Sequence, residues 1–325
     1  MNVRSPALLG LKTLLAAAAL AGSLGAYAQA WPDKAVKFIV PLPPGGPSDI
    51  VLRSALEKMQ GTLKQPLVLE NKPGAAGNLG AGEAARAAPD GYTWLFTTDT
   101  LVTVNPHVYD KLTFKASDLQ PVMRASAFSQ TLVCNPALGV KTVADLVRRA
   151  KEKQISYASG GAGSPGHLTT EQFKAAAGIQ MLHIPYKGPA PAMQDVMAGQ
   201  VDCGFLAGPT VLPHVRGGKL VALAVSGARR SSLLPEVPTV AESGFPGFDA
   251  SFSLVLFAPK GTPAPVVQAM HAAMSAALKT PDLVEKLRQS DQEALAASTA
   301  DTVTRLTNDS NKWGEVARRI NLRLE

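Results

Sequence analysis

The sequence predicts an α/β protein built from two lobes, each of which is a mainly parallel sheet flanked by helices. Segments 36–59 and 155–178 both read as a strand, a glycine-containing loop and a helix, and they lie more than one hundred residues apart. Along most of the chain, short apolar runs of strand type alternate with longer segments of helical periodicity. This alternation is typical of parallel sheets that are covered by helices.

The first thirty residues have the pattern of a secretory signal peptide. Arg4 and Lys12 accompany an apolar core at 14–21, and the stretch ends in the small-residue sequence AYAQA, which offers cleavage after Ala28 or Ala30. A membrane anchor, which is the alternative, needs a longer apolar span. We therefore expect an exported protein that works in the periplasm.

The charge pattern argues against a nucleic-acid partner. The whole chain has 32 Lys and Arg against 25 Asp and Glu, a formal net charge of +7. Removing the first thirty residues takes away two basic residues, so the mature chain keeps 30 basic and 25 acidic residues. These charges are scattered, without a Lys/Arg run or an aromatic-basic stripe, as on an ordinary solvated surface.

Cys134 and Cys203 are the only cysteines, and no His or Cys stands at metal-ligand spacing. We therefore expect no metal and no cofactor. In an oxidising compartment the two cysteines could pair, yet both lie in apolar, strand-like segments. The sequence leaves two alternatives open, namely two buried free thiols or one disulfide.

Strand 36–40 opens the first lobe and runs into the stiff loop 41–46, PLPPGG. Pro47 suits the first turn of the helix that follows, because the N–H group that proline lacks would have no partner there. The next apolar residues recur at i, i+3, i+4 and i+7, which is the spacing of an amphipathic helix: Leu52, Ala55, Leu56 and Met59.

Two further loops of this lobe follow strands in the same way. Strand 66–70 leads into loop 71–77, and strand 92–96 leads into loop 97–100. In parallel sheets, ligands bind at the carboxyl ends of the strands. These two loops share that position with loop 41–46.

The second lobe centres on segment 155–178, ISYASGGAGSPGHLTTEQFKAAAG. Ser164 is placed as an N-cap, Pro165 suits the first helical turn, and Gly178 ends the helix. The glycine loop before Ser164 therefore aims free N–H groups and the positive end of a helix dipole at one point, which binds an anion. Together with loop 41–46, it predicts two mouths that face one ligand.

The remaining segments define the lobes. The extended segments 125–132 and 220–226 are candidate crossings, and two crossings make a hinge of limited freedom. We assign residues 31–126 and 225–325 to the first lobe, which includes C-terminal helices that brace it from behind. Residues 127–224 form the second lobe.

Several short motifs recur in a fixed order: Trp31-Pro32; Val40-Pro41 with Pro44-Gly45-Gly46, Asp49 and Arg53; Glu70-Asn71-Lys72-Pro73-Gly74-Ala75 with Gly77; Pro89-Asp90-Gly91-Tyr92-Thr93; Gly161-Ala162-Gly163-Ser164 with His167-Leu168; Pro185-Tyr186-Lys187-Gly188; Gly199-Gln200-Val201-Asp202; Leu234-Pro235-Glu236-Val237-Pro238-Thr239; and Ala258-Pro259-Lys260-Gly261-Thr262-Pro263. With them, nearly the whole mature chain resembles the Bug family, the periplasmic substrate-binding components of tripartite tricarboxylate-type transporters. The resemblance implies a periplasmic-binding-protein fold of type II, a two-lobed "Venus flytrap" that closes on a small carboxylate.

The resemblance also implies that backbone N–H groups and ordered water hold the ligand. Such neutral donors suit a protein that must release a carboxylate, and glycines let the backbone approach closely because they have no Cβ. Serine and threonine hydroxyls can add donors. The predicted ligand-binding residues are Pro44, Gly45, Gly46, Asp49, Thr97, Thr98, Asp99, Ser159, Gly161, Ala162, Gly163, Ser164, His167, Tyr186 and Asp202.

Several of these side chains have a structural alternative. His167 would bond the ligand or brace its loop. Asp49 would contact the ligand or bond back to the Gly46 N–H group, and it would pair with Arg53 one helical turn later. Asp202 would meet the ligand through water or fix the hinge.

Asp99 carries the largest consequence for the ligand. If Asp99 faces the cleft, it repels a second carboxylate and receives an ammonium group, which favours an amino acid or another zwitterion. If it caps a turn, it says nothing about the ligand. Tyr186 has a similar pair of readings, as a wall of the pocket or as a packed aromatic.

An exported hydrolase is the alternative from another class. It would use Ser164, His167 and an acid such as Asp202, and the first two lie on one helical turn. However, the chain has no G-x-S-x-G elbow, and an N-cap serine already has its oxygen engaged. The glycine loops also lack the G-K-[ST] ending of a phosphate-binding P-loop.

We therefore expect a monomeric, non-enzymatic periplasmic protein. It binds a small carboxylate, either an organic acid or an amino acid, closes around it and delivers it to membrane transporter subunits. A ligand sensor that acts on a signalling partner is a further alternative.

Overall fold

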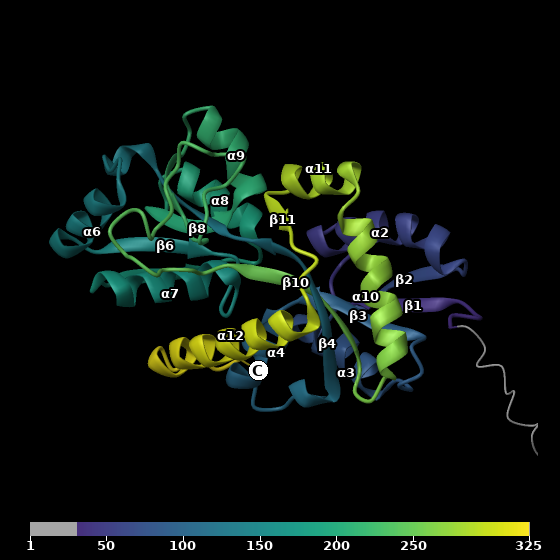
Figure 1. Cartoon of the computed structure of the whole chain (residues 1–325). Coiled ribbons are helices and arrows are strands. Elements are labelled where there is room, and N and C mark those ends of the chain that lie inside the picture. Colours follow the sequence, from purple (N-terminus) through teal and green to yellow (C-terminus); the bar gives the residue numbers. More distant parts are fainter. Residues whose placement is uncertain (1–30, 325) are drawn as a thin grey trace, which may run out of the picture.

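The computed structural model describes residues 31–324 and divides their strands between two sheets (Figure 1). The predicted signal peptide lies outside the described residues. One sheet has six strands in the order β11-β4-β10-β3-β1-β2, and the other has five in the order β7-β6-β8-β5-β9. The structure thus has the two-lobed α/β architecture that the sequence predicts.

The six-stranded sheet takes its strands from both ends of the chain: β1 (Val36–Val40), β2 (Leu67–Asn71), β3 (Thr93–Thr98), β4 (Leu119–Phe128), β10 (Phe252–Pro259) and β11 (Gln292–Ala294). Helices α2 (Pro47–Leu63), α10 (Ala264–Leu278) and α11 (Pro281–Gln289) pack on one face. Helices α3 (Asn78–Arg86) and α4 (Thr100–Thr103) pack on the other. Successive strand residues point to opposite faces, so Phe38 packs with α2 and α10 whereas Ile39 packs with α3.

The five-stranded sheet is also covered on both faces. Its strands are β5 (Gln130–Cys134), β6 (Ile155–Ser159), β7 (Met181–Pro185), β8 (Cys203–Ala207) and β9 (Val221–Val225). Helices α6 (Val143–Glu152) and α7 (Pro165–Ala177) pack on one face, and α8 (Pro189–Met197) and α9 (Gly208–Arg216) pack on the other.

Both sheets combine parallel and antiparallel strands. β2 and β3 run parallel to β1, and β7 and β8 run parallel to β6, as the strand and helix alternation predicts. The strands that connect the lobes are antiparallel to their neighbours, as β10 is to β3 and β5 is to β8. The reason is geometric. β10 and β5 arrive from the other lobe, so each begins beside the carboxyl end of its neighbouring strand and runs in the opposite direction.

The two lobe crossings lie at different distances from their predicted places. The first, at Ser129 between β4 and β5, falls within the predicted segment. The second predicted crossing, 220–226, is instead mostly β9, which is the edge strand next to β5 in the five-stranded sheet. The N–H group of Val225 donates to the Pro238 carbonyl (2.9 Å), which holds the following segment on this sheet until just before β10. We therefore propose residues 129–250 as the second lobe.

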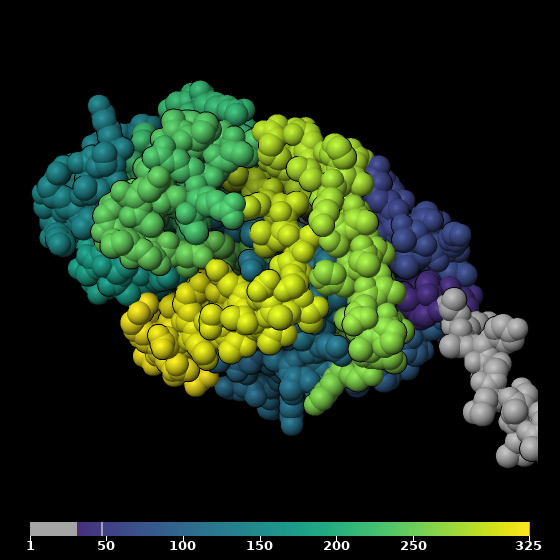
Figure 2. Space-filling view, in the orientation of Figure 1, coloured from purple at the N-terminus to yellow at the C-terminus, as the bar shows by residue number. Residues whose placement is uncertain are grey.

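The C-terminal helix α12 (Thr299–Arg319) lies across the junction of the lobes. It packs against β4 and α4 in the first lobe and against α7 in the second. Figure 2 shows this C-terminal part, in yellow, spanning the space between the two lobes. Trp313 on α12 stacks on Phe252 with ring centroids 5.2 Å apart and shares an apolar cluster with Tyr157 of the second lobe.

Candidate functional site

The loop-bearing edges of the two sheets face each other. Phe128, the last residue of β4, pairs with Phe252, the first residue of β10, beside the carboxyl end of β3. Gln130, the first residue of β5, pairs with Ala207 at the carboxyl end of β8, and β6 runs parallel to β8. Because Ser129 alone separates β4 from β5, the carboxyl ends of β1, β3, β6 and β8 all lie toward the junction.

In the loop after β1, Pro44 and Gly45 are exposed and Asp49 is buried. Asp49 accepts a hydrogen bond from the Gly45 N–H group (3.1 Å) and pairs with Arg53, whose Nε lies 2.9 Å from Oδ2. Burial alone would raise the pKa of Asp49, but the hydrogen bonds from Arg53 and Gly45 lower it below its ordinary value. Asp49 therefore takes its structural alternative, although its backbone partner is Gly45 rather than the predicted Gly46.

Helix α2 begins at this loop without a side-chain cap among the described residues. Its N-cap, Gly46, has an ordinary extended backbone (φ −76°, ψ 169°). The N–H groups of an uncapped first turn need partners, and together with the helix dipole they suit an anion. The structure thus keeps here the donors that the sequence predicts.

The loop after β6 is held from within by its own side chains. The Ser159 hydroxyl accepts from the Gly161 N–H group (3.2 Å), and Ser164 caps α7 by accepting from the His167 N–H group (3.4 Å). Gly161 and Gly163 have φ values of +123° and +74°, which side-chain-bearing residues rarely adopt. Ala162 at the tip of this loop is exposed.

His167 braces the loop rather than reaching beyond it. Its Nδ1 accepts from the Gly163 N–H group (3.0 Å), and its ring stacks on His183 with centroids 4.1 Å apart. His183 in turn stacks on Tyr157, and its Nε2 lies 2.7 Å from the Ser159 hydroxyl. Burial, and then the neighbouring His183, lower the pKa of His167 to about 4, so its ring is neutral and can accept at physiological pH.

The histidine stack is a part of the site that our sequence reasoning missed. The sequence analysis assigns no role to His183. His183 lies in the middle of β7, opposite Tyr157 and two residues before the end of the strand that runs beside Ser159. This position is the signal that could have indicated a contact with the glycine loop.

Asp99 is the N-cap residue of α4, but its side chain caps no backbone group of that helix. It is fully buried, and its Oδ2 accepts from the Ser253 N–H group of β10 (2.8 Å). Burial, and then repulsion from Asp309, raise the pKa of Asp99 to about 7. The carboxylate of Asp99 therefore faces the sheet and the C-terminal helix, and we correct the expectation that it receives a ligand ammonium group. Of the turn-capping alternative only the backbone part holds, because the Asp99 carbonyl accepts from the Thr103 N–H group (3.0 Å).

The threonines beside Asp99 differ in exposure. Thr97 is buried in β3, and the half-buried Thr98 has its hydroxyl 2.8 Å from that of Thr100. Of the two, Thr98 is therefore placed to offer a hydroxyl at the carboxyl end of β3.

Tyr186 and Asp202 lie at opposite ends of the second lobe. Tyr186 is half-buried in the loop after β7, its hydroxyl donates to Asp195 (2.5 Å), and burial raises its pKa to about 12. Asp202 precedes β8, five residues before the carboxyl end, and accepts from the N–H and hydroxyl groups of Ser156 (both 2.8 Å). A strand of that length spans about 17 Å, so Asp202 lies far from the junction, and we correct its assignment as a ligand contact.

These placements also remove the geometry of a hydrolase. The oxygen of Ser164 accepts from the His167 backbone, Nδ1 of His167 accepts from Gly163, and Asp202 lies at the other end of the sheet. A catalytic triad needs its nucleophile within hydrogen-bond reach of the base, and the base within hydrogen-bond reach of an orienting acid.

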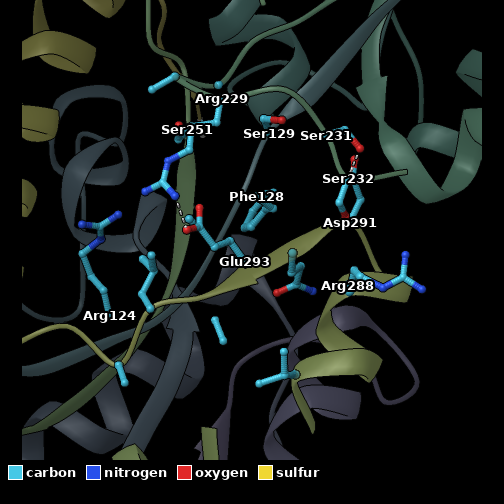
Figure 3. Close-up of a pocket in the computed structure, with 18 of the residues that line it drawn as sticks. Arg124, Phe128, Ser129, Arg229, Ser231, Ser232, Ser251, Arg288, Asp291 and Glu293 are labelled. Carbon is cyan, nitrogen blue, oxygen red and sulfur yellow. Dashed lines mark hydrogen bonds and ion pairs between the residues drawn. The ribbon is translucent and has the colours of Figure 1, made fainter. Parts of the chain in front are cut away.

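A cavity of about 860 Å³ lies at the lobe junction and has linings from both lobes. It borders β11 and the crossing at Ser129, and β11 lies on the opposite side of β4 from β1 and β3. Figure 3 shows Arg229 paired with Glu293, and Ser231 facing Asp291. Sequence reasoning did not predict this cavity, because its walls come from segments far apart in the chain.

A second cavity of about 570 Å³ lies between α7 and the end of α12, and His167, Glu171 and Arg319 are among its lining residues. No helix within residues 31–324 is both long enough and apolar enough to cross a membrane. In that same part of the chain, no group of three or more His, Cys, Asp or Glu side chains is arranged to hold a metal ion.

Comparison with known proteins relates this geometry to a family. The family described as "Tripartite tricarboxylate transporter family receptor" matches residues 51–322. Protein BugT of Bordetella pertussis is 32% identical over 302 residues, covering 92% of this chain and 93% of that protein.

Two solved structures with bound carboxylates are also similar. Rpa4515 of R. palustris with adipate is 30% identical, with a TM-score of 0.77 over 90% of this chain and 99% of that one. MatC of Rhodopseudomonas palustris with bound malate is 27% identical, with a TM-score of 0.72 over 88% of this chain and 99% of that one. The chain therefore belongs to the tripartite tricarboxylate transporter receptor family, the Bug-type periplasmic solute-binding proteins, and not to a family of enzymes.

Proposed function

We propose that the protein binds a small organic carboxylate between its two glycine loops and delivers it to a tripartite tricarboxylate-type transporter. The observation that carries the proposal is that the uncapped N-terminus of α2 and the braced glycine loop both follow strands whose carboxyl ends point toward the junction. Two sets of neutral N–H donors suit the oxygens of a carboxylate. The adipate and malate found in two relatives support this ligand class.

The ligand we propose is a plain mono- or dicarboxylate rather than an amino acid. An ammonium group needs an acceptor, and Asp99, the acidic residue expected to supply one, is fully buried against β10. The binding residues we propose are Pro44, Gly45, Gly46, Thr98, Gly161, Ala162, Gly163 and Ser164, with Tyr186 as a wall. Asp49, Ser159 and His167 hold the loops.

Delivery requires closure and export. We propose that the lobes rotate about the two crossings, that the closed form of this periplasmic monomer docks on the membrane subunits, and that the signal peptide is cleaved after Ala28 or Ala30. The contacts that join the lobes beside the cavity, such as Arg229 with Glu293, would change during this rotation.

The test is calorimetric titration and thermal unfolding of the refolded mature protein with C3 to C6 mono- and dicarboxylates, aromatic acids, citrate and amino acids. A ligand at 100 times its dissociation constant should stabilise the protein by about 2.7 kcal/mol. Binding of amino acids alone would overturn the choice of a plain acid. If no carboxylate binds, the proposed function fails.

A matched pair of variants tests the site. A Cβ added at Gly46 would meet nothing closer than the Pro43 carbonyl at 3.6 Å, so Gly46→Ala should fold normally. Its methyl group would cover the first-turn donors and weaken binding roughly tenfold or more. Gly61→Ala, near the other end of α2, meets no atom within 4 Å and should leave affinity unchanged. Equal affinity in both variants would place the ligand elsewhere.

A further inference from the structure

The two cysteines lie directly opposite each other in the five-stranded sheet. Cys134 ends β5, Cys203 begins β8, and the two are register partners of this antiparallel pair. Both side chains are fully buried, and both are free thiols in the structure. Residues that face each other across two strands point to the same side of the sheet, so the two sulfur atoms share one apolar cluster.

The hydrogen-bond pattern defines which kind of pair they form. The N–H group of Asn135 donates to the Asp202 carbonyl (2.9 Å), which makes Asn135 and Asp202 a hydrogen-bonded pair. Such pairs alternate with non-hydrogen-bonded pairs, so Cys134 and Cys203 form a non-hydrogen-bonded pair, in which Cα atoms are about 4.5 Å apart. Disulfides need Cα atoms about 4.4–6.8 Å apart, and this pair meets that requirement without a change of register.

We propose that Cys134 and Cys203 form a disulfide bond in the exported protein. Two S–H bonds break and one S–S bond forms. The two electrons and the two protons pass to a disulfide-type oxidant, whose own S–S bond is cleaved to two thiols. The proposal rests on the proposed export, because an oxidising compartment supplies such an oxidant.

The burial of both thiols determines when the bond forms. A disulfide-type oxidant cannot reach a fully buried sulfur, so oxidation takes place while β5 and β8 are still assembling or during transient opening. If the two thiols are still reduced when the lobe has folded, the fold shields them from the oxidant and they stay reduced.

The bond would stabilise the second lobe without touching the ligand site. It closes a loop of about 70 residues that contains β6, α7, β7 and α8, and a loop of that length restricts the unfolded chain strongly. The cysteines sit at the start of β8, whereas the braced glycine loop lies at the carboxyl end of β6, which runs parallel to β8. We therefore expect stability to change and carboxylate affinity to stay the same.

The experiment compares the mature chain refolded with oxidised or with reduced glutathione. After oxidation we expect no free thiol under denaturing conditions, a monomer on a non-reducing gel, and a mass about 2 Da below that of the reduced chain. The unfolding temperature should be higher by roughly 10 °C. The variant Cys134→Ala/Cys203→Ala should behave alike in both buffers.

Two free thiols after oxidative refolding, or only intermolecular disulfides, would overturn the proposal. Loss of carboxylate binding on oxidation would contradict the separation of the two sites. The thiol count does not depend on any ligand, so this proposal and the proposed function can fail independently.

Discussion

The two glycine loops face the same junction, yet they are built differently. The loop after β1 has exposed residues at its tip and one buried carboxylate, Asp49, that holds a single N–H group. The loop after β6 rests on a stack of Tyr157, His183 and His167, with Ser159 and His167 each holding a glycine N–H group. The first lobe thus presents a lightly held helix terminus, and the second presents a loop that is organised before any ligand arrives. Preorganisation of this kind reduces the cost of ordering on binding.

The largest effect should follow from removing the brace. We expect His167→Ala to lower the free energy of unfolding by roughly 3 kcal/mol, because it deletes a buried ring and leaves the Gly163 N–H group without its acceptor. The unfolding temperature should fall by about 6–12 °C, and carboxylate affinity should fall with it. Urea unfolding and calorimetric titration measure the two effects.

His167→Gln is the control, because its side-chain oxygen can still accept from Gly163. It should recover part of the affinity that His167→Ala loses. Normal affinity in the alanine variant would show that ligand binding does not depend on the brace of the second loop. The proposed difference between the two loops would then have no effect on binding.

The pH dependence of stability offers a further test, because the pKa values of two buried groups, His167 and Asp99, are shifted in opposite directions. The pKa of His167 is lowered to about 4, so the unfolded chain binds this proton more readily. The stability that the neutral ring contributes is complete above about pH 6.5 and declines as the pH falls toward 4, by about 3 kcal/mol. His167→Gln should remove this decline.

Asp99 has the opposite effect on how stability changes with pH. Its pKa is raised to about 7, so the folded chain holds a proton that the unfolded chain has released, and stability declines as the pH rises from about 4 to about 7. Asp99→Asn keeps an acceptor for the Ser253 N–H group and should stabilise the protein by about 2 to 4 kcal/mol at pH 8, but not at pH 4. Urea unfolding of the two variants and the parent between pH 4 and 8 measures both profiles. Parallel profiles for all three would show that neither group titrates as the structure indicates.

Local rules predicted the helix starts, the glycine loops and the carboxyl-end positions from the sequence. Ser164 as an N-cap and the Asp49–Arg53 pair depend on neighbours within four residues, and both are present. Those local rules could not predict that Asp99 is buried, because the groups that surround it, Ser253 of β10 and the C-terminal helix, are far away in the sequence. Asp202 was misplaced because its motif contains no indication of which end of β8 faces the junction.

Long-range packing also determines where the chain returns from the second lobe to the first. An extended apolar segment such as 220–226 fits a strand within one lobe as well as a strand that crosses between lobes. The hydrogen bond from Val225 to Pro238 keeps this segment and the one after it on the second lobe's sheet. The histidine stack depends likewise on β6 and β7 being neighbours in register. Sheet order is therefore the information that the sequence lacked.

The smallest effect should come from the lightly held loop. In Asp49→Asn, the side-chain oxygen still accepts from the Gly45 N–H group, and only the charge pairing with the half-exposed Arg53 is lost. An ion pair with one exposed partner contributes less than about 1 kcal/mol, so urea unfolding should show a loss of that size or smaller. Arg53→Gln, which removes the same pair from its exposed side, should match it. A loss in Asp49→Asn as large as that in His167→Ala would mean that the carboxylate charge, and not only its oxygen, organises the first loop, and the two loops would then be braced to the same degree.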